Sequence, residues 1–154
     1  GERTPHNDPH IRGSFHSMKT TTDATNMQYA VIEGVSFGIL DGINSILKVN
    51  NQFEKIFMVG GGSRSSFWIE LLASLLKRKL SVCDQSEFGA ALGVARLAMY
   101  VDKNIQTKNE IIKEIKISKN YDPNLDKIKI LLKRYEIWKD LYTSNKKIAP
   151  KLLT

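Results

Sequence analysis

Three consecutive glycines, Gly60 to Gly62, constrain the fold of this chain most strongly. They follow an apolar run at 55–59, which predicts a short buried strand. Beyond them, apolar residues recur at the spacing of one helix face, at Phe67, Trp68, Leu71, Leu72, Leu75 and Leu76. The glycines therefore lie in a strand-to-helix turn. Such a turn either lets a phosphate approach the main chain closely or only connects two elements.

The residues after the turn allow a specific nucleotide-binding hypothesis. Ser63, Ser65 or Ser66 can cap the helix, whose N-terminal N–H groups favour an anion, and a strand around 79–83 completes a β-α-β unit. The spacing Gly60-x-Gly62-x-x-Ser65 departs from the dinucleotide fingerprint only at the third glycine, and Asp84 lies where a ribose-binding acid would end the second strand. A stand-alone Rossmann-like module is therefore one interpretation. A Walker A site is excluded, because no Lys-Ser or Lys-Thr pair follows the glycines.

Two helices rich in small residues flank this unit. The first is predicted over about 26–48, with Asp23 or Thr25 as its cap, and the second over 87–99. Glycines four apart line one face of each helix, namely Gly34, Gly38 and Gly42 in the first, and Gly89 and Gly93 in the second. Each glycine costs about 1 kcal/mol relative to alanine in a helix interior. We therefore expect neighbouring elements to pack closely on these faces.

The basic residues are concentrated in the last third of the chain. The formal net charge is +7, and residues 101–154 carry thirteen Lys or Arg against seven Asp or Glu. These lysines alternate with acidic residues and isoleucine, which predicts solvated faces of amphipathic elements and argues against a nucleic-acid surface. We expect a loop at 118–123 and a last amphipathic helix at about 124–145, with Pro123 near its start.

The first 26 residues are loop-like and contain all three histidines. His6 and His10 are four apart, but Pro9 makes a continuous helix between them improbable, which argues against a metal site. The polar residues of this loop that suit either a ligand-facing network or a role in holding the loop are Arg3, Asp8 and Arg12. No Ser-His-Asp or Cys-His constellation and no pair of catalytic carboxylates can be identified.

Cysteine usage and hydropathy argue against further classes of protein, namely disulfide-bonded and membrane-spanning proteins. Cys83 is the single cysteine, so it forms no internal disulfide, and a structural role is expected. No run approaches the roughly 18 apolar residues of a membrane span, and no signal sequence is recognisable, so we expect a cytoplasmic protein without a membrane partner. The chain starts at Gly1 without an initiator methionine, and we expect it to be a fragment of a longer protein.

Four sequence blocks occur in a fixed order over the first hundred residues. They are the run at 1–9 followed by Arg12-Gly13, the stretch from Gly13 to Glu33, the turn at 60–65 with Trp68, and the segment at 87–93. Together these blocks resemble the FGGY family of carbohydrate kinases. The chain departs from the family's pattern at Ala73-Ser74 and at 77–80, where relatives often have an Ala-Asp pair and a Gly-x-Pro turn.

The resemblance implies a fold and a division of the chain. Members have two ribonuclease H-like (actin-like ATPase) domains, with substrates in the cleft between them. This chain would be the C-terminal part of the second domain, of class α/β, with a mixed sheet flanked by helices. Within residues 1–154 we expect a loop region at 1–26, a helix-strand-helix-strand-helix core of the nucleotide site at 27–100, and a basic helical tail at 101–154.

The resemblance also implies site residues. Gly61 and Gly62 would approach the phosphates of ATP through the main chain, and Ser63, Arg64 and Ser66 would lie near the phosphates, ribose or adenine. Ser66 occupies a position where some relatives use asparagine for the base. The catalytic aspartate and most sugar contacts lie upstream in the family, so no catalytic or metal-binding residue is assigned within this chain. Mg²⁺ would bridge the phosphates in the intact enzyme.

The implied activity is ATP-dependent phosphorylation of a sugar, and the loop at 1–9 favours D-xylulose, giving D-xylulose 5-phosphate. The chain would form one wall of the ATP site, and alone it is expected to be inactive and to bind nucleotide weakly. The expected partners are ATP or ADP, and the sugar mainly through the missing N-terminal part, with no nucleic acid and no membrane. A homodimer stays open, as does an interaction module that uses surface exposed by truncation.

Overall fold

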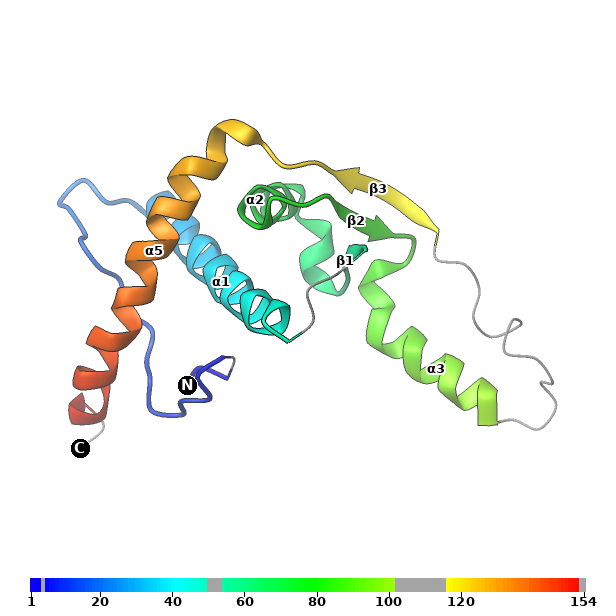
Figure 1. The fold of residues 1–154 in the computed structure, drawn as a ribbon, viewed down its shortest axis with the longest axis horizontal. Helices are drawn as coiled ribbons and strands as arrows, with labels where there is room; N and C mark the ends of the chain where they lie inside the picture. The colour runs from blue at the N-terminus through cyan, green and yellow to red at the C-terminus, as the bar shows by residue number, and fades with distance from the viewer. Residues whose placement is uncertain (4, 50–53, 102–115, 153–154) are drawn as a thin grey trace.

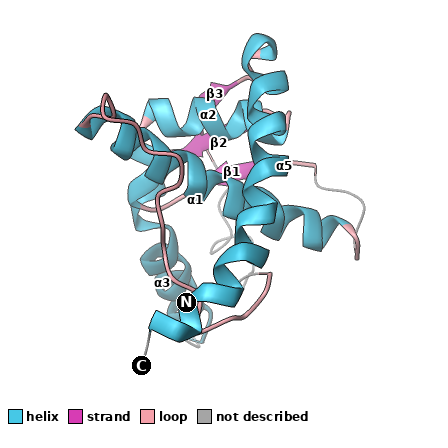
Figure 2. Cartoon of the chain, turned by 90° about the vertical axis from the view of Figure 1, so that its left-hand side faces the viewer, coloured by secondary structure: helices cyan, strands magenta, loops and turns pink. Residues whose placement is uncertain are grey.

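The computed structural model describes residues 1–3, 5–49, 54–101 and 116–152, and shows a small mixed sheet flanked by helices (Figures 1 and 2). The described helices and strands are α1 (Ala24–Leu47), β1 (Ile56–Met58), α2 (Ser66–Leu76), β2 (Leu80–Cys83), α3 (Gly89–Val101), β3 (Ile117–Tyr121) and α5 (Leu125–Ile148). Short 3-10 helices occur at Gly61–Arg64, Ser86–Phe88 and Ala149–Leu152. The predicted α/β class and the order of the first five elements are confirmed.

The sheet combines a predicted pairing with an unpredicted one. Strands β1 and β2 are parallel, with Ile56 opposite Leu80, and α2 connects them as the β-α-β unit requires. Strand β3 pairs antiparallel with β2, so the sheet order is β1-β2-β3. The loop predicted at 118–123 is therefore wrong over the residues of β3. The sequence of β3 lacks the alternation of apolar and polar residues that marks a half-buried strand, and only Tyr121 of this strand is buried.

Helix α2 supplies the core on two sides. Toward the sheet, Ile69 and Leu72 join a cluster with Leu80, Val82 and Tyr121. On the other side, Leu71 and Leu75 pack with residues of the two long helices: Phe37 and Leu40 of α1, and Leu131 and Tyr135 of α5. Figure 1 shows α2 between the sheet and these helices. This double burial explains why apolar residues occupy both faces of so short a helix.

The glycine faces of α1 and α3 are only partly packed. A Cβ on Gly34 would lie 3.9 Å from Trp138 Nε1, and one on Gly89 would lie 3.1 Å from Val59 Cβ. At Gly38 and Gly93, nothing in the described part of the chain lies within 4 Å of a Cβ. The expected close packing is thus found at Gly34 and Gly89, and it is wrong for Gly38 and Gly93 within the described residues. Helix α3 has no buried residue and extends away from the other helices in Figure 1.

Helix α1 has the length and composition of a membrane span, although charged residues interrupt its apolar sequence. A core helix of a soluble protein meets the same criterion. Here α1 packs on α2 and α5 through Phe37 and Leu40, and Glu33 accepts a hydrogen bond of 2.8 Å from Arg134 Nη1. Its N-terminus is capped by Asp23, as predicted, in a reciprocal capping box with Asn26.

Helix α2 ends at a residue in the left-handed conformation. Lys77 has φ +54°, and the N–H groups of Lys77 and Arg78 donate to the carbonyls of Ser74 and Ala73. Helices commonly end with such a residue, and it is usually glycine because a Cβ is disfavoured there. The departure at 77–80 thus places an exposed lysine where the backbone prefers glycine.

We expect the substitution Lys77→Gly to raise the free energy of unfolding by about 0.5–1 kcal/mol, because it removes the left-handed strain at a modest cost in chain entropy. Urea denaturation of the chain measures this change. Lys48→Gly is the matched control, since Lys48 caps α1 with an ordinary φ of −67° and should gain nothing. A Lys77→Gly variant no more stable than the parent would contradict the expectation.

Candidate functional site

The glycine turn connects β1 to α2 through a 3-10 helix. Gly60 precedes this helix with φ +84°, a conformation that side chains other than glycine's rarely adopt, and its N–H donates to the carbonyl of Ser86 at 2.8 Å. Ser65 caps α2, since its Oγ accepts a hydrogen bond from the N–H of Trp68 at 3.3 Å. The predicted strand-to-helix turn is confirmed, and Ser65 is the capping serine.

Ser63 is buried and braces the turn from inside. Its Oγ donates to the carbonyl of Gly60 at 2.7 Å and lies 2.7 Å from Ser86 Oγ. A hydroxyl carries one proton, so Ser86 must be the donor in the second bond. The side chain of Ser63 is therefore occupied within the protein. Its contribution is to the shape of the turn and to the attachment of the segment that begins α3.

Arg64 joins the same two segments at the surface. Its Nε and Nη2 donate to Glu87 Oε2 at 2.8 and 2.5 Å. The Arg64 side chain is 72% exposed, and an ion pair this exposed contributes less than about 1 kcal/mol to stability. The guanidinium is thus held beside the turn by a partner that an anionic ligand could replace.

The main chain of the turn is open on one side. Gly61 and Gly62 begin the 3-10 helix, so their N–H groups have no acceptor within it. A Cβ on Gly61 would meet nothing within 4 Å among the described residues, whereas one on Gly62 would lie 2.7 Å from Trp68 Cζ3. Gly61 therefore faces open space. The lack of a side chain thus leaves open space at Gly61 and makes room for Trp68 at Gly62.

The structure brings four of the five predicted site residues together in this turn: Gly61, Gly62, Ser63 and Arg64. Ser66 begins α2 instead, and its Oγ lies 3.1 Å from the hydroxyl of Tyr121 on β3. Sequence reasoning missed Ser86 and Glu87 as partners of the turn. The family resemblance implied that the helix starting at Glu87 packs behind this turn, but it named neither side chain as a partner.

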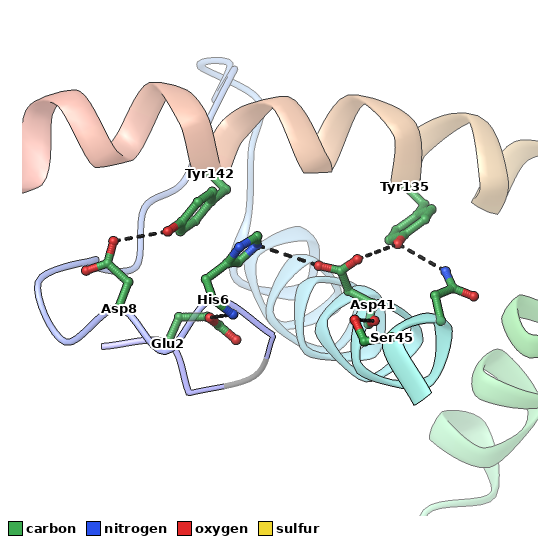
Figure 3. Close-up of polar contacts among 8 residues, drawn as sticks. Glu2, His6, Asp8, Asp41, Ser45, Tyr135 and Tyr142 are labelled. Atoms are coloured by element: carbon green, nitrogen blue, oxygen red, sulfur yellow. Dashed lines mark hydrogen bonds and ion pairs between the residues drawn. The ribbon is translucent and has the colours of Figure 1, made fainter. Parts of the chain in front are cut away.

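The N-terminal loop forms a second polar cluster, shown in Figure 3. The His6 ring stacks on Tyr142 of α5 with centroids 3.7 Å apart, and its Nε2 lies 3.7 Å from Asp41 Oδ2 on α1. Tyr142 donates to Asp8 Oδ2 at 3.1 Å. The N–H of His10 donates to Asp8, and this bond is the main cause that lowers the pKa of the Asp8 carboxyl. The loop is thereby attached to both long helices.

The polar residues of the loop could either face a ligand or hold the loop in shape, and these contacts favour the second role. Asp8 and Glu2 exchange two backbone hydrogen bonds, and Arg12 Nη1 donates to the carbonyls of Pro9 and Ile11 at 2.8 and 2.9 Å. Within the described ranges, no group of three or more His, Cys, Asp or Glu side chains could hold a metal ion.

Tyr135 extends this cluster into the core. Its hydroxyl donates to Asp41 Oδ1 at 2.9 Å and accepts from Asn44 Nδ2 at 3.3 Å. Burial raises the pKa of Tyr135 to about 12; the Asp41 carboxylate also raises it, whereas the hydrogen bond from Asn44 lowers it. The neutral phenol is therefore the form that the folded chain stabilises.

The fold and the ordered blocks define a C-terminal domain of the kind found in sugar kinases, and comparison with known proteins agrees. The model of the FGGY family of carbohydrate kinases, C-terminal domain, matches residues 1–101. The chain belongs to this family.

Two individual relatives that match the chain are both xylulose kinases. The chain is 30% identical over its whole length to a xylulose kinase of Staphylococcus epidermidis and covers 31% of that protein. It is 28% identical to a xylulose kinase of Escherichia coli over 92% of the chain, covering 29% of that protein. The chain thus spans about a third of the length of the relatives that it matches.

Solved structures confirm the fold. A kinase from Brucella ovis, described as a xyloylose kinase, matches with a TM-score of 0.80 and 30% identity over 94% of this chain and 30% of its own. A ligand-bound xylulose kinase from Lactobacillus acidophilus matches at 0.78 with 27% identity, over 99% of this chain and 31% of its own. A gluconate kinase from the same organism also scores 0.78, with 26% identity over the same shares. The expected C-terminal part of an actin-like ATPase domain is confirmed.

The raised pKa of Tyr135 predicts a loss of stability at alkaline pH. Between pH 10 and about 12 the tyrosine ionises in the unfolded chain but not in the folded one, so the free energy of unfolding falls as the pH rises. We expect Tyr135→Phe to make this decline shallower, as measured by urea denaturation at pH 9 to 11.5. Tyr100→Phe, at an exposed position on α3, should leave it unchanged. Equal slopes for Tyr135→Phe and the parent would contradict the expectation.

Proposed function

We propose that this chain forms one wall of the ATP site in an ATP-dependent sugar kinase. The observation that carries the proposal is the glycine turn itself, where the open space beside Gly61 and the exposed side chain of Arg64 belong to the same 3-10 helix, whose first N–H groups have no acceptor within it. Main-chain amides and an arginine are suited to bind phosphate oxygens. Membership in a carbohydrate kinase family supports ATP as the nucleotide.

Each residue of the proposed site has a distinct task. Gly61 and Gly62 offer main-chain N–H groups to the phosphates, while Ser63 holds the turn in shape. Arg64 would exchange its contact with Glu87 for the phosphates or ribose, and Ser66 at the start of α2 would lie near the ribose or adenine. No acidic cluster in the described residues fits Mg²⁺, so this ion would enter on the phosphates of the nucleotide.

For the longer protein we propose phosphorylation of D-xylulose to D-xylulose 5-phosphate. Several relatives are named xylulose kinases, and the loop at 1–9 favours the same sugar. The sugar would bind mainly through parts beyond this chain, since a gluconate kinase is equally similar in structure over the same region. ATP or ADP and the sugar are the proposed partners, in the cytoplasm, without membrane or nucleic acid; a homodimer is compatible with the proposal. Residues 101–154, expected to be a basic helical tail, include 102–115, which lie outside the described residues; the described part is integral to the fold, since β3 pairs with β2 and α5 contributes Leu131 and Tyr135 to the core.

The nucleotide proposal predicts weak but specific binding of ADP to the chain, measured by isothermal titration calorimetry. Gly61→Ala should lower the affinity about tenfold, or ~1.4 kcal/mol, because the added methyl group occupies the space that the phosphates need. The fold should be unaffected, since that space is empty of protein atoms among the described residues. Gly38→Ala, at an equally open position within α1, is the matched control and should keep the parent affinity. Unchanged ADP affinity in Gly61→Ala would contradict the proposal.

A dinucleotide-binding module is the competing hypothesis, and one observation favours it. Asp84 follows β2 directly and is exposed, in the position where such folds bind a ribose hydroxyl. The same calorimetry with NAD in place of ADP separates the two hypotheses. Tighter binding of NAD than of ADP, lost in Asp84→Asn, would favour the dinucleotide module.

We expect the chain alone to show no turnover with ATP and D-xylulose, because no catalytic base is assigned within it. A coupled assay that detects ADP release measures this, with a sugar-free reaction as its control. Sugar-dependent ADP release above the control would show that the chemistry lies within these residues.

A further inference from the structure

We propose that Trp68 is a positioning residue for the glycine turn, and that residue 62 is a glycine because of this indole and not because of the ligand. The part of this proposal that concerns nucleotide binding rests on the proposed function. The part that concerns the contact between Trp68 and residue 62 does not. Trp68 lies in the first turn of α2, directly beside the 3-10 helix that contains Gly62.

The geometry shows contact between the indole and the turn. A Cβ on Gly62 would lie 2.7 Å from Cζ3, 3.2 Å from Cε3 and 3.6 Å from Cη2 of Trp68. These three atoms belong to the six-membered part of the indole, so a methyl group at residue 62 would collide with its face or edge. The first of these distances is shorter than carbon atoms tolerate, and ring atoms do not yield as a flexible chain end does.

Backbone conformation does not explain the glycine at this position. Among the described glycines, only Gly60 has a positive φ. Gly61 adjoins open space in the described structure, and Gly62 adjoins the indole. The three glycines therefore answer three different requirements, which are a left-handed backbone at Gly60, room for a ligand at Gly61 and room for Trp68 at Gly62.

The indole is fixed in place from its other side. Its Nε1 donates to Ser36 Oγ on α1 at 2.9 Å, and Ser36 is fully buried and donates in turn to the carbonyl of Ile32 at 2.7 Å. Trp68 also packs against the buried cluster between α2 and the sheet. This hydrogen bond and this packing resist displacement of the ring. The shape of the turn is thereby coupled to the packing of α2 on α1.

A double-mutant cycle on the 154-residue chain tests the structural part. Gly62→Ala should lower the melting temperature by about 4–8 °C, since overpacking against the ring must strain the turn or displace the indole. In a Trp68→Phe background, which removes the atoms nearest to residue 62, the same substitution should lower it by less than half as much. Gly61→Ala is the control and should have the same small effect in both backgrounds. An equal loss from Gly62→Ala with and without the indole would overturn the proposal.

Ser36→Ala provides a second variant if Trp68→Phe does not fold. It removes the acceptor that holds Nε1, so the ring can yield and the penalty of Gly62→Ala should again decrease. The proposal would be overturned if Gly62→Ala kept its full loss of melting temperature in the Ser36→Ala background and either kept it in the Trp68→Phe background too or Trp68→Phe failed to fold.

ADP affinity, measured by calorimetry, separates positioning from a merely structural role. Gly62→Ala should weaken ADP binding, and adding Trp68→Phe should restore it at least threefold, whereas Gly61→Ala should not be rescued. A Gly62→Ala defect that persists without the indole would show that the ligand itself requires this glycine, and would overturn the proposal. If no variant binds ADP, the proposed function fails while the melting temperatures still decide the role of Trp68.

Discussion

The burial of α2 on two opposite sides is the constraint on which the rest of the structure depends. One side packs against β2 and β3 through Ile69 and Leu72, and the other packs against α1 and α5 through Leu71 and Leu75. The sheet is too small to form a core alone, and the two long helices meet α2 rather than the sheet. Because α2 begins immediately after the glycine turn, whatever places this helix also places the proposed nucleotide site.

The turn itself is held by contacts that leave its outer face open. Gly60 and Ser63 bond to Ser86, and Arg64 pairs with Glu87, so the segment that starts α3 closes the inner side. From beneath, Trp68 extends the support to Ser36 on α1. In our proposal the first N–H groups of the 3-10 helix and the exposed Arg64 side chain bind the anion.

The chain thus belongs to the FGGY family and contains the elements proposed to hold the nucleotide, but it spans about a third of its matched relatives. Phosphoryl transfer depends mainly on positioning and charge neutralisation. In our proposal the turn contributes to both, while sugar recognition and proton abstraction belong to parts outside this chain. The loop at 1–9, held on α1 and α5 by His6 and Asp8, has a structural role in the geometry seen here.

The ordered blocks of the family were recognised by resemblance. Local physics made further features readable from the sequence alone, namely the β-α-β unit, the glycine turn and the candidate caps, which were Asp23 or Thr25 for α1 and Ser63, Ser65 or Ser66 for α2. Each depends on residues close together in the chain. Tertiary structure alone decided that 117–121 is a strand, that Gly62 accommodates Trp68, and that Tyr142 bonds to Asp8. The strand lacks an apolar alternation of its own, and Asp8 and Tyr142 are 134 positions apart. Which side chains meet across such distances is set by how α2 brings the helices and the sheet together, and no local pattern encodes it.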